Sequence, residues 1–211
     1  DAWTELPNGV ADATPDNDLF TTGVFYASLA GTYTVGGFAP DFNLVSDLET
    51  ILNAAGIVNN VTFQFRPGEY VEALSITDFP RIAYAHTVTF TSESGDSTDV
   101  ILTQNANNTV LVDLDDAHRI TFSHLSLTNT KSHIFQIRNG SSQISIANNS
   151  LEGPVALSSS RILIYSSTTT EDSLSILNNR LHNGYYGIYL YGGDYEKRHI
   201  ITGNTFTGNY H

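Results

Sequence analysis

Apolar residues recur in the second half of the chain in four similar segments. The segments begin at Ile120 (ITFSHLSL), Ile144 (ISIANNSL), Leu174 (LSILNNRL) and Ile200 (IITGNTF). Within each segment, apolar residues mostly alternate with polar ones, which is typical of a strand with one buried face. The last apolar positions follow one another at intervals of 24, 30 and 25 residues: Leu127, Leu151, Leu181 and Phe206. This periodicity predicts a repeating all-β structure.

A second column of strands precedes these segments. Its tetrapeptides VDLD, FQIR, ILIY and IYLY begin at Val112, Phe135, Ile162 and Ile188. Two strand columns joined by variable links describe a parallel solenoid, in which each coil pairs with the next at about 4.8 Å. Asparagines recur in the first column and favour corners, because asparagine tolerates left-handed backbone. A β-sandwich is the alternative, but its hairpins would need two-residue Asn-Gly links between adjacent strands, which the repeats lack.

The first half of the chain predicts a capping helix over residues 41–56, with Asp41 as N-cap and Gly56 as C-terminal stop. Apolar residues occur there at helical spacing: Phe42, Val45, Leu48, Ile51, Leu52 and Ala55. We expect this amphipathic helix to cover the open end of the solenoid, where unpaired strand edges invite aggregation. Residues 1–40 then form a strand and loop region. Residues 57–211 form the coils, which we expect to be cut short at the C-terminus.

Composition and charge narrow the possible partners. Hydrophobic residues make up 40% of the chain and charged residues 15%, which is typical of a globular protein. No apolar run approaches the roughly 18 residues of a membrane span, so we expect no membrane insertion. Without cysteine, disulfides and thiolate metal sites are excluded. The net charge is −13, with −15 in residues 1–116 and +2 in residues 117–211. The acidic first half disfavours nucleic acid and anionic lipid.

Several strings together resemble a known family. They are GTYTVGG from Gly31, FRPGEY from Phe65, TVTFTSESGDSTDVIL from Thr87 and YGIYLYGG from Tyr186. Over residues 30–210 the chain resembles the right-handed parallel β-helix, pectin-lyase-like domains of secreted and surface proteins of Bacteroidota. The resemblance implies a right-handed parallel β-helix, export by the type IX secretion route, and a secreted or cell-surface location. It also implies contacts with the remaining coils or domains of a longer protein. The class contains enzymes and adhesins, so it leaves the function open.

The best acidic cluster for catalysis is DLDD. Asp113 and Asp115 alternate with apolar residues, so both should point outward, where paired carboxylates can bind Ca²⁺ or act as acid and base. With Arg138 they are the candidate catalytic residues of a calcium-assisted uronate lyase or a related pectin-active enzyme. The alternative is a solvated strand face followed by a turn. The chain lacks the Gln-Asp and His-Gly motifs of the methylesterase and polygalacturonase branches of the resembled class.

Five tyrosines lie in GYYGIYLYGGDY, which begins at Gly184. Strand alternation predicts that Ile188 and Leu190 point into the core and that Tyr189 and Tyr191 point outward. Stacking the coils predicts two outward columns. The first is Asp113, Gln136, Leu163 and Tyr189, and the second is Asp115, Arg138, Tyr165 and Tyr191.

Aromatic ring faces suit the C–H surfaces of sugars. The predicted ligand-binding residues are therefore Gln136, Arg138, Tyr165, Tyr189 and Tyr191. Alternatively, the tyrosines support one another beneath a folded loop, or they contact a protein partner. We expect a non-catalytic surface or adhesive structural module that binds glycan or polysaccharide, with no resident cofactor or metal but with Ca²⁺ as a candidate ion. A polysaccharide-degrading enzyme is the alternative.

Overall fold

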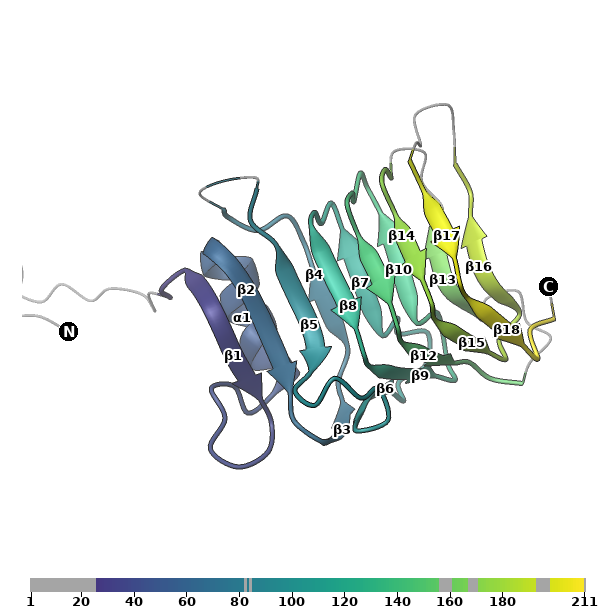
Figure 1. The fold of residues 1–211 in the computed structure, drawn as a ribbon, viewed down its shortest axis with the longest axis horizontal. Coiled ribbons are helices and arrows are strands. Elements are labelled where there is room, and N and C mark those ends of the chain that lie inside the picture. The colour runs from purple at the N-terminus through teal and green to yellow at the C-terminus, as the bar shows by residue number, and fades with distance from the viewer. Residues whose placement is uncertain are drawn as a thin grey trace, which may run out of the picture.

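The computed structural model describes residues 26–81, 83, 85–155, 161–166, 171–192 and 198–210. They form a parallel β-solenoid of about six turns with one short helix, stacked from β1 at one end to β17 and β18 at the other (Figure 1). All strand pairs are parallel and join one coil to the next. This confirms the predicted fold class and excludes the β-sandwich.

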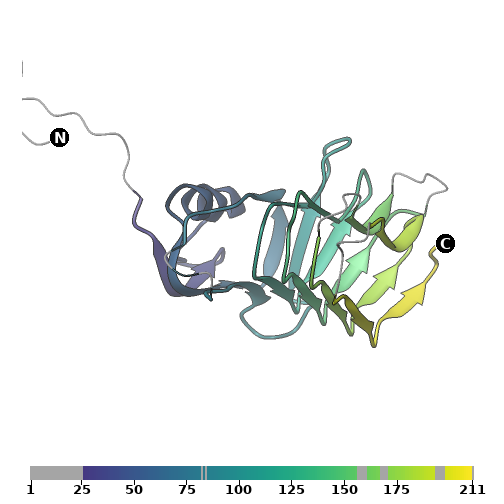
Figure 2. The same ribbon diagram turned by 90° about the horizontal axis from the view of Figure 1, so that it is seen from above.

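Three sheets run along the solenoid and surround its core (Figure 2). The seven-stranded sheet contains β1 (Leu29–Val35), β2 (Ile57–Phe65), β5 (Val88–Ser92), β8 (Ile120–Ser123), β11 (Ser145–Ala147), β14 (Ser175–Leu177) and β17 (Ile200–Thr202). The six-stranded sheet contains β3 (Gly68–Val71), β6 (Val100–Gln104), β9 (Ser126–Asn129), β12 (Ser150–Glu152), β15 (Arg180–His182) and β18 (Thr205–Thr207). The five-stranded sheet contains β4 (Leu74–Ile76), β7 (Val112–Asp115), β10 (Phe135–Arg138), β13 (Ile162–Ser166) and β16 (Tyr186–Leu190).

The sequence predicted two strand columns where the structure has three sheets. Each segment of the first column bends in its middle, at a residue with left-handed backbone. These residues are His124, Asn148, Asn178 and Gly203, with φ of 55°, 57°, 53° and 70°. The strand before the bend joins the seven-stranded sheet, and the strand after it joins the six-stranded sheet. The asparagines were therefore correctly assigned to corners, but the corner lies within the repeat.

A buried asparagine follows this bend in successive coils. Asn179 Oδ1 accepts a hydrogen bond from the Asn149 backbone N–H at 2.9 Å, and Asn204 Oδ1 accepts one from the Asn179 N–H at 2.9 Å. The Asn179 side-chain amide donates to the Ile146 carbonyl at 2.8 Å. Asn149 and Asn179 are almost completely buried. The ladder thus satisfies corner backbone groups that cannot reach water.

The core is built from the inward residues of all three sheets. Phe63, Phe90 and Phe122 form a stack with ring centroids 5.2 and 4.8 Å apart, and none of them is exposed. The stack arises because the same inward position of successive coils carries the same ring. It contributes dispersion and burial along the solenoid axis.

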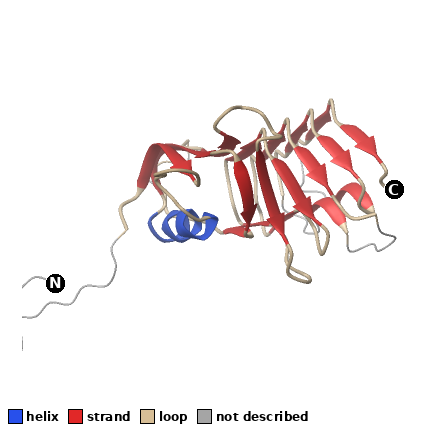
Figure 3. Ribbon diagram, turned by 90° about the horizontal axis from the view of Figure 1, so that it is seen from below, coloured by secondary structure: helices blue, strands red, loops and turns tan. Residues whose placement is uncertain are grey.

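The helix α1 (Val45–Ala55) is shorter than the predicted 41–56 and lies at the N-terminal end of the solenoid (Figure 3). It contacts β4. Its side chains form hydrogen bonds with the backbone at the free edge of β4. Glu49 Oε2 accepts one from the Ser75 N–H at 3.0 Å, and Asn53 Nδ2 donates one to the Ser75 carbonyl at 2.9 Å. The helix therefore covers the edge of the five-stranded sheet. The described residues contain no helix with the length and apolarity to span a bilayer.

The predicted N-cap at Asp41 is wrong. The Asp41 carboxylate instead accepts hydrogen bonds from the Thr34 N–H and hydroxyl, at 2.7 and 2.8 Å. The first helical N–H groups are bound by Glu72 of the next coil, at 3.2 Å for Val45 and 3.0 Å for Ser46. Gly56 does end the helix, with φ of 66° and its N–H bonded to the Leu52 carbonyl. Sequence reasoning favoured the nearest acid, whereas the fold supplies one from a neighbouring coil.

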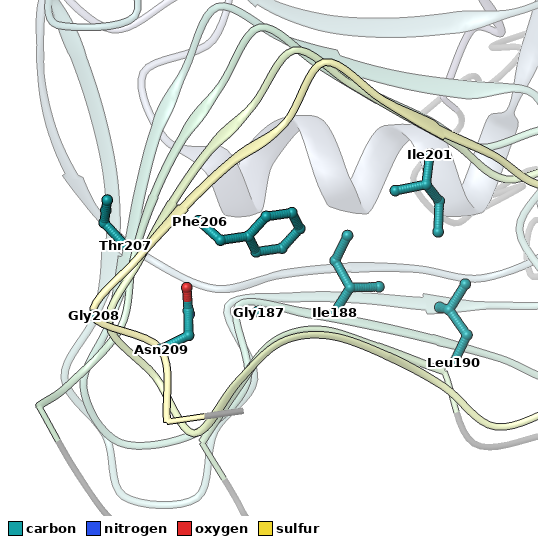
Figure 4. Close-up of a pocket in the computed structure, with 8 residues that line it drawn as sticks. All are labelled: Gly187, Ile188, Leu190, Ile201, Phe206, Thr207, Gly208 and Asn209. Carbon is teal, nitrogen blue, oxygen red and sulfur yellow. The ribbon is translucent and has the colours of Figure 1, made fainter.

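The last coil leaves apolar side chains open to solvent. Ile188, Leu190, Ile201 and Phe206 point toward one another across this end and line a depression of about 610 Å³ (Figure 4). Ile201 and Phe206 are 47% and 49% exposed. The prediction that Ile188 and Leu190 point inward is confirmed.

Candidate functional site

The outward face of the five-stranded sheet carries a polar and aromatic column. Backbone register places five residues at one level of successive strands: Ser75, Asp113, Gln136, Tyr165 and Tyr189. Parallel strands lie about 4.8 Å apart, so these side chains follow one another closely along the axis. The column changes from acid through amide to aromatic rings. It combines hydrogen-bonding groups and ring faces on one continuous surface.

The predicted columns are corrected at β13. Tyr165 lies beside Gln136, and not beside Arg138 as the sequence suggested. Leu163, which was placed in the outward column, is buried in the core against Gly153 and Gly184. The reason is that two consecutive residues join the core where strands of this sheet begin, namely Ile134–Phe135 and Leu163–Ile164. Alternation from Ile162 therefore placed Leu163 on the wrong face, and the pairing is displaced by two residues because Ile164, and not Ile162, lies beside Phe135.

In the second predicted column, the register of the described strands pairs Asp115 with Arg138. Tyr191 follows β16, is 60% exposed and has its N–H bonded to the Ser166 carbonyl at 2.9 Å. Its side chain is the most exposed of the three predicted tyrosines. Tyr165 and Tyr189 are half-buried.

Arg138 joins both carboxylates of the DLDD cluster. Its Nε and Nη2 donate to the two oxygens of Asp113 at 3.0 and 2.9 Å, and its Nη1 lies 2.9 Å from Asp115 Oδ2. Asn139 donates to the other Asp115 oxygen at 2.7 Å. The hydrogen bonds to Asp113, together with the charges of both carboxylates, raise the pKa of Arg138 above its ordinary value. The candidate catalytic residues thus lie together, as a compact ion-pair network.

This network limits the chemistry of the cluster. Every oxygen of Asp113 and Asp115 already accepts a hydrogen bond or an ion-pair contact. A guanidinium whose pKa is raised by two carboxylates is a poor proton acceptor. Within the described residues, no group of three or more His, Asp or Glu side chains is placed to hold a metal ion.

A chain of aromatic rings continues from the column. His133 stacks on Tyr165 with centroids 4.5 Å apart, Tyr165 lies 5.9 Å from Tyr189, and Tyr189 lies 5.2 Å from Tyr186. Tyr186 contacts Tyr185 at 4.8 Å, and Tyr185 stacks on Tyr210 at 5.1 Å. We call these six residues the aromatic ridge: His133, Tyr165, Tyr189, Tyr186, Tyr185 and Tyr210.

Sequence reasoning missed His133, Tyr185, Tyr186 and Tyr210 as members of this surface. Tyr185 and Tyr186 belong to the tyrosine-rich string, but strand alternation did not place them. His133 lies in the link between β9 and β10, and Tyr210 follows β18, so no strand periodicity applies to either residue. His133 Nδ1 accepts a hydrogen bond from the Ile162 N–H at 3.2 Å, and burial lowers the pKa of His133. A neutral imidazole therefore lies at one end of the aromatic ridge.

The fold and this face define a parallel β-solenoid with a polar and aromatic outer surface. Comparison with solved structures finds the same right-handed parallel β-helix in a pectin methylesterase from Aspergillus niger, in a penultimately deglycosylated form. The match has a TM-score of 0.53 at 12% identity and covers 87% of this chain and 68% of that one. The deglycosylated form of the same enzyme matches with a TM-score of 0.49 at 12% identity, over 80% and 62% of the two chains. No family model and no curated protein matches the sequence.

Proposed function

We propose that this chain is an extracellular β-helix module that binds carbohydrate, without chemical turnover, on the outer face of its five-stranded sheet. The observation that carries the proposal is the register of Gln136, Tyr165 and Tyr189 in one outward column, extended by the aromatic ridge. Half-buried rings offer apolar faces for sugar C–H groups, while the Gln136 side-chain amide offers a donor and an acceptor. Surfaces of this composition, apolar with a few placed polar groups, are typical of ligand sites.

The resemblance of the sequence to secreted and surface β-helix domains supports a proposal about where this module acts. We propose that it is a surface or adhesive part of a larger secreted protein of the Bacteroidota type IX secretion kind. The remaining domains of that protein would be its neighbours, and glycan would be its ligand. The negative net charge of −13 supports an exterior role through solubility, and it disfavours nucleic acid.

The alternative is an enzyme acting on polysaccharide. It is favoured by the fold shared with a pectin methylesterase. A calcium-assisted lyase would use Asp113, Asp115 and Arg138, the residues of the ion-pair network. Because that network occupies the carboxylate oxygens, we propose carbohydrate binding as the main function and polysaccharide turnover as the alternative.

A glycan array with and without Ca²⁺, followed by affinity measurements on the retained polysaccharide, tests the proposal. We expect retention that does not depend on Ca²⁺ and no release of unsaturated, ultraviolet-absorbing products. Tyr165→Ala and Tyr189→Ala should each raise the dissociation constant about five- to tenfold, since one lost ring contact is worth about 1 kcal/mol. Tyr26→Ala is the matched control, because Tyr26 is a partly exposed tyrosine at the other end of the solenoid. Equal affinity of all three variants would contradict the proposal, and calcium-dependent product release would establish the lyase.

A further inference from the structure

A serine, a histidine and an aspartate meet at the corner between the five-stranded and seven-stranded sheets. His118 and Ser142 form an isolated parallel bridge between successive coils. The Nδ1 atom of His118 lies 2.8 Å from Ser142 Oγ. The Nε2 atom of His118 lies 3.3 Å from Asp116 Oδ1. The three side chains come from two coils and are brought together by the register of the solenoid.

The arrangement favours one tautomer of His118. A carboxylate close to Nε2 stabilises the form with its proton on Nε2, because the partner of one ring nitrogen sets the state of the other. Nδ1 then carries the lone pair and can accept the Ser142 hydroxyl proton. A distance of 2.8 Å is within the hydrogen-bond reach that a nucleophile and its general base require.

A small cavity opens onto this pair. Its volume is about 290 Å³, and its lining residues are Arg81, His118, Arg119, Ser142 and Gln143. His118 has 27% of its side chain exposed, so solvent and small molecules reach it. Arg81 is held in place by its Nη1 bond to the His118 carbonyl at 3.1 Å and by its position 4.3 Å over the Phe79 ring. Two arginines, Arg81 and Arg119, therefore line the same cavity as Ser142.

We infer that Ser142 and His118 form a nucleophile–base pair that hydrolyses short-chain acyl esters in this cavity, with Asp116 as a positioning residue. The pair resembles the serine–histidine–acid constellation that recurs on unrelated folds and is recognised by geometry and not by chain order. The positive charge of Arg81 and Arg119 stabilises the oxyanion that develops on the acyl group. This inference goes beyond glycan binding and does not use the outer face of the five-stranded sheet.

The reaction balances without a co-reactant other than water. Ser142 Oγ bonds to the acyl carbon while its proton passes to His118 Nδ1. The bond from the acyl carbon to the alcohol oxygen breaks, and the alcohol leaves with that proton. Water then attacks the acyl-serine ester and gives a proton to Nδ1, the carboxylic acid leaves, and the proton returns to Ser142 Oγ. The cavity volume restricts the acyl group to a short chain.

A fluorophosphonate probe on the whole chain tests the inference, because it forms a covalent adduct only with an activated serine. We expect one adduct per chain on the peptide that contains Ser142, together with hydrolysis of p-nitrophenyl acetate. Ser142→Ala should abolish both, and His118→Ala should slow labelling by at least about a hundredfold, the usual effect of losing a general base. Ser123→Ala is the matched control, since Ser123 is another half-buried outward serine with a hydroxyl partner.

The Asp116→Asn variant distinguishes a role of Asp116 in positioning His118 from a role in folding. We expect the labelling rate to fall while the thermal midpoint stays the same, because Asp116 is 53% exposed. Absence of an adduct on the wild-type chain, which requires no variant to fold, would overturn the inference. An adduct that persists in Ser142→Ala would overturn it equally. Loss of glycan retention in Tyr189→Ala has no bearing on this result, so the two proposals fail independently.

Discussion

Arg138 holds Asp113 of the preceding coil through two parallel hydrogen bonds of 3.0 and 2.9 Å. This fork is the geometry in which guanidinium and carboxylate groups bind each other most strongly. The same guanidinium reaches Asp115, so one cation pairs with two carboxylates on the outward face. The ion pair thus links two successive coils of the solenoid.

Removal of Arg138 should convert the network into a cation site. In Arg138→Met, Asp113 and Asp115 lose their shared partner and repel each other, so the free energy of unfolding should fall by about 1–3 kcal/mol. Added Ca²⁺ should then raise the thermal midpoint of the variant and leave that of the wild type unchanged. Arg180→Met is the control, since Arg180 is exposed on the six-stranded sheet. A wild-type chain stabilised as much as the variant would show that Arg138 does not occupy the site.

The asparagine ladder should contribute strongly to stability. Asn179→Ala leaves the Asn149 N–H and the Ile146 carbonyl without their partners in a buried corner, so it should lower the free energy of unfolding by about 2–4 kcal/mol. Urea denaturation measures this change. Asn178→Gly is the control, because Asn178 has φ of 53°, a backbone conformation that glycine adopts freely. Equal losses in both variants would mean that the side-chain bonds of Asn179 are not the cause.

The phenylalanine stack should be sensitive to truncation. Phe90 lies between Phe63 and Phe122 and is completely buried, so Phe90→Ala should cost about 3–5 kcal/mol in the free energy of unfolding. Phe38→Ala should have almost no effect, since Phe38 is 93% exposed. Thermal or urea denaturation of both variants checks the difference. A small effect of Phe90→Ala would indicate that the coils collapse to refill the cavity.

Stability should respond to pH through Glu49. Burial, with a smaller effect from the Glu72 charge, raises the pKa of Glu49 above its ordinary 4.5, although its bond from the Ser75 N–H opposes the shift. Because the pKa is raised in the folded state, the contribution of Glu49 to stability is fully present at pH values below its unfolded-state pKa. This contribution is lost as the pH rises through its folded-state pKa. Glu49→Gln should therefore raise the thermal midpoint at pH 7, and its advantage should shrink as pH falls toward 4.5.

The control for Glu49→Gln is Glu69→Gln, because Glu69 is exposed on β3. Its thermal midpoint should follow that of the wild type across the same pH range. A Glu49→Gln midpoint below that of the wild type at pH 7 would show that the ionised carboxylate stabilises the edge of β4, contrary to the prediction.

Much of the fold could be predicted from the sequence because burial in a solenoid repeats locally. Alternating apolar residues in segments such as ITFSHLSL identify strands, and their interval identifies coils, without knowledge of any distant contact. The amphipathic pattern of residues 41–56 likewise identified the helix. Less of the candidate site could be predicted in this way. The ligand-binding role of Gln136, Arg138, Tyr165, Tyr189 and Tyr191 stays a prediction.

The sequence by itself determined that this chain stacks parallel coils, since the period of its apolar residues depends only on which positions are buried. Only the tertiary structure decided which outward side chains become neighbours. Backbone pairing sets Ile164, and not Ile162, beside Phe135 and so places Tyr165 beside Gln136. Links of variable length bring His118 to Ser142 and Glu72 to the beginning of α1. These contacts depend on loop geometry and on hydrogen bonds between coils. Neither leaves a periodic signal in the chain.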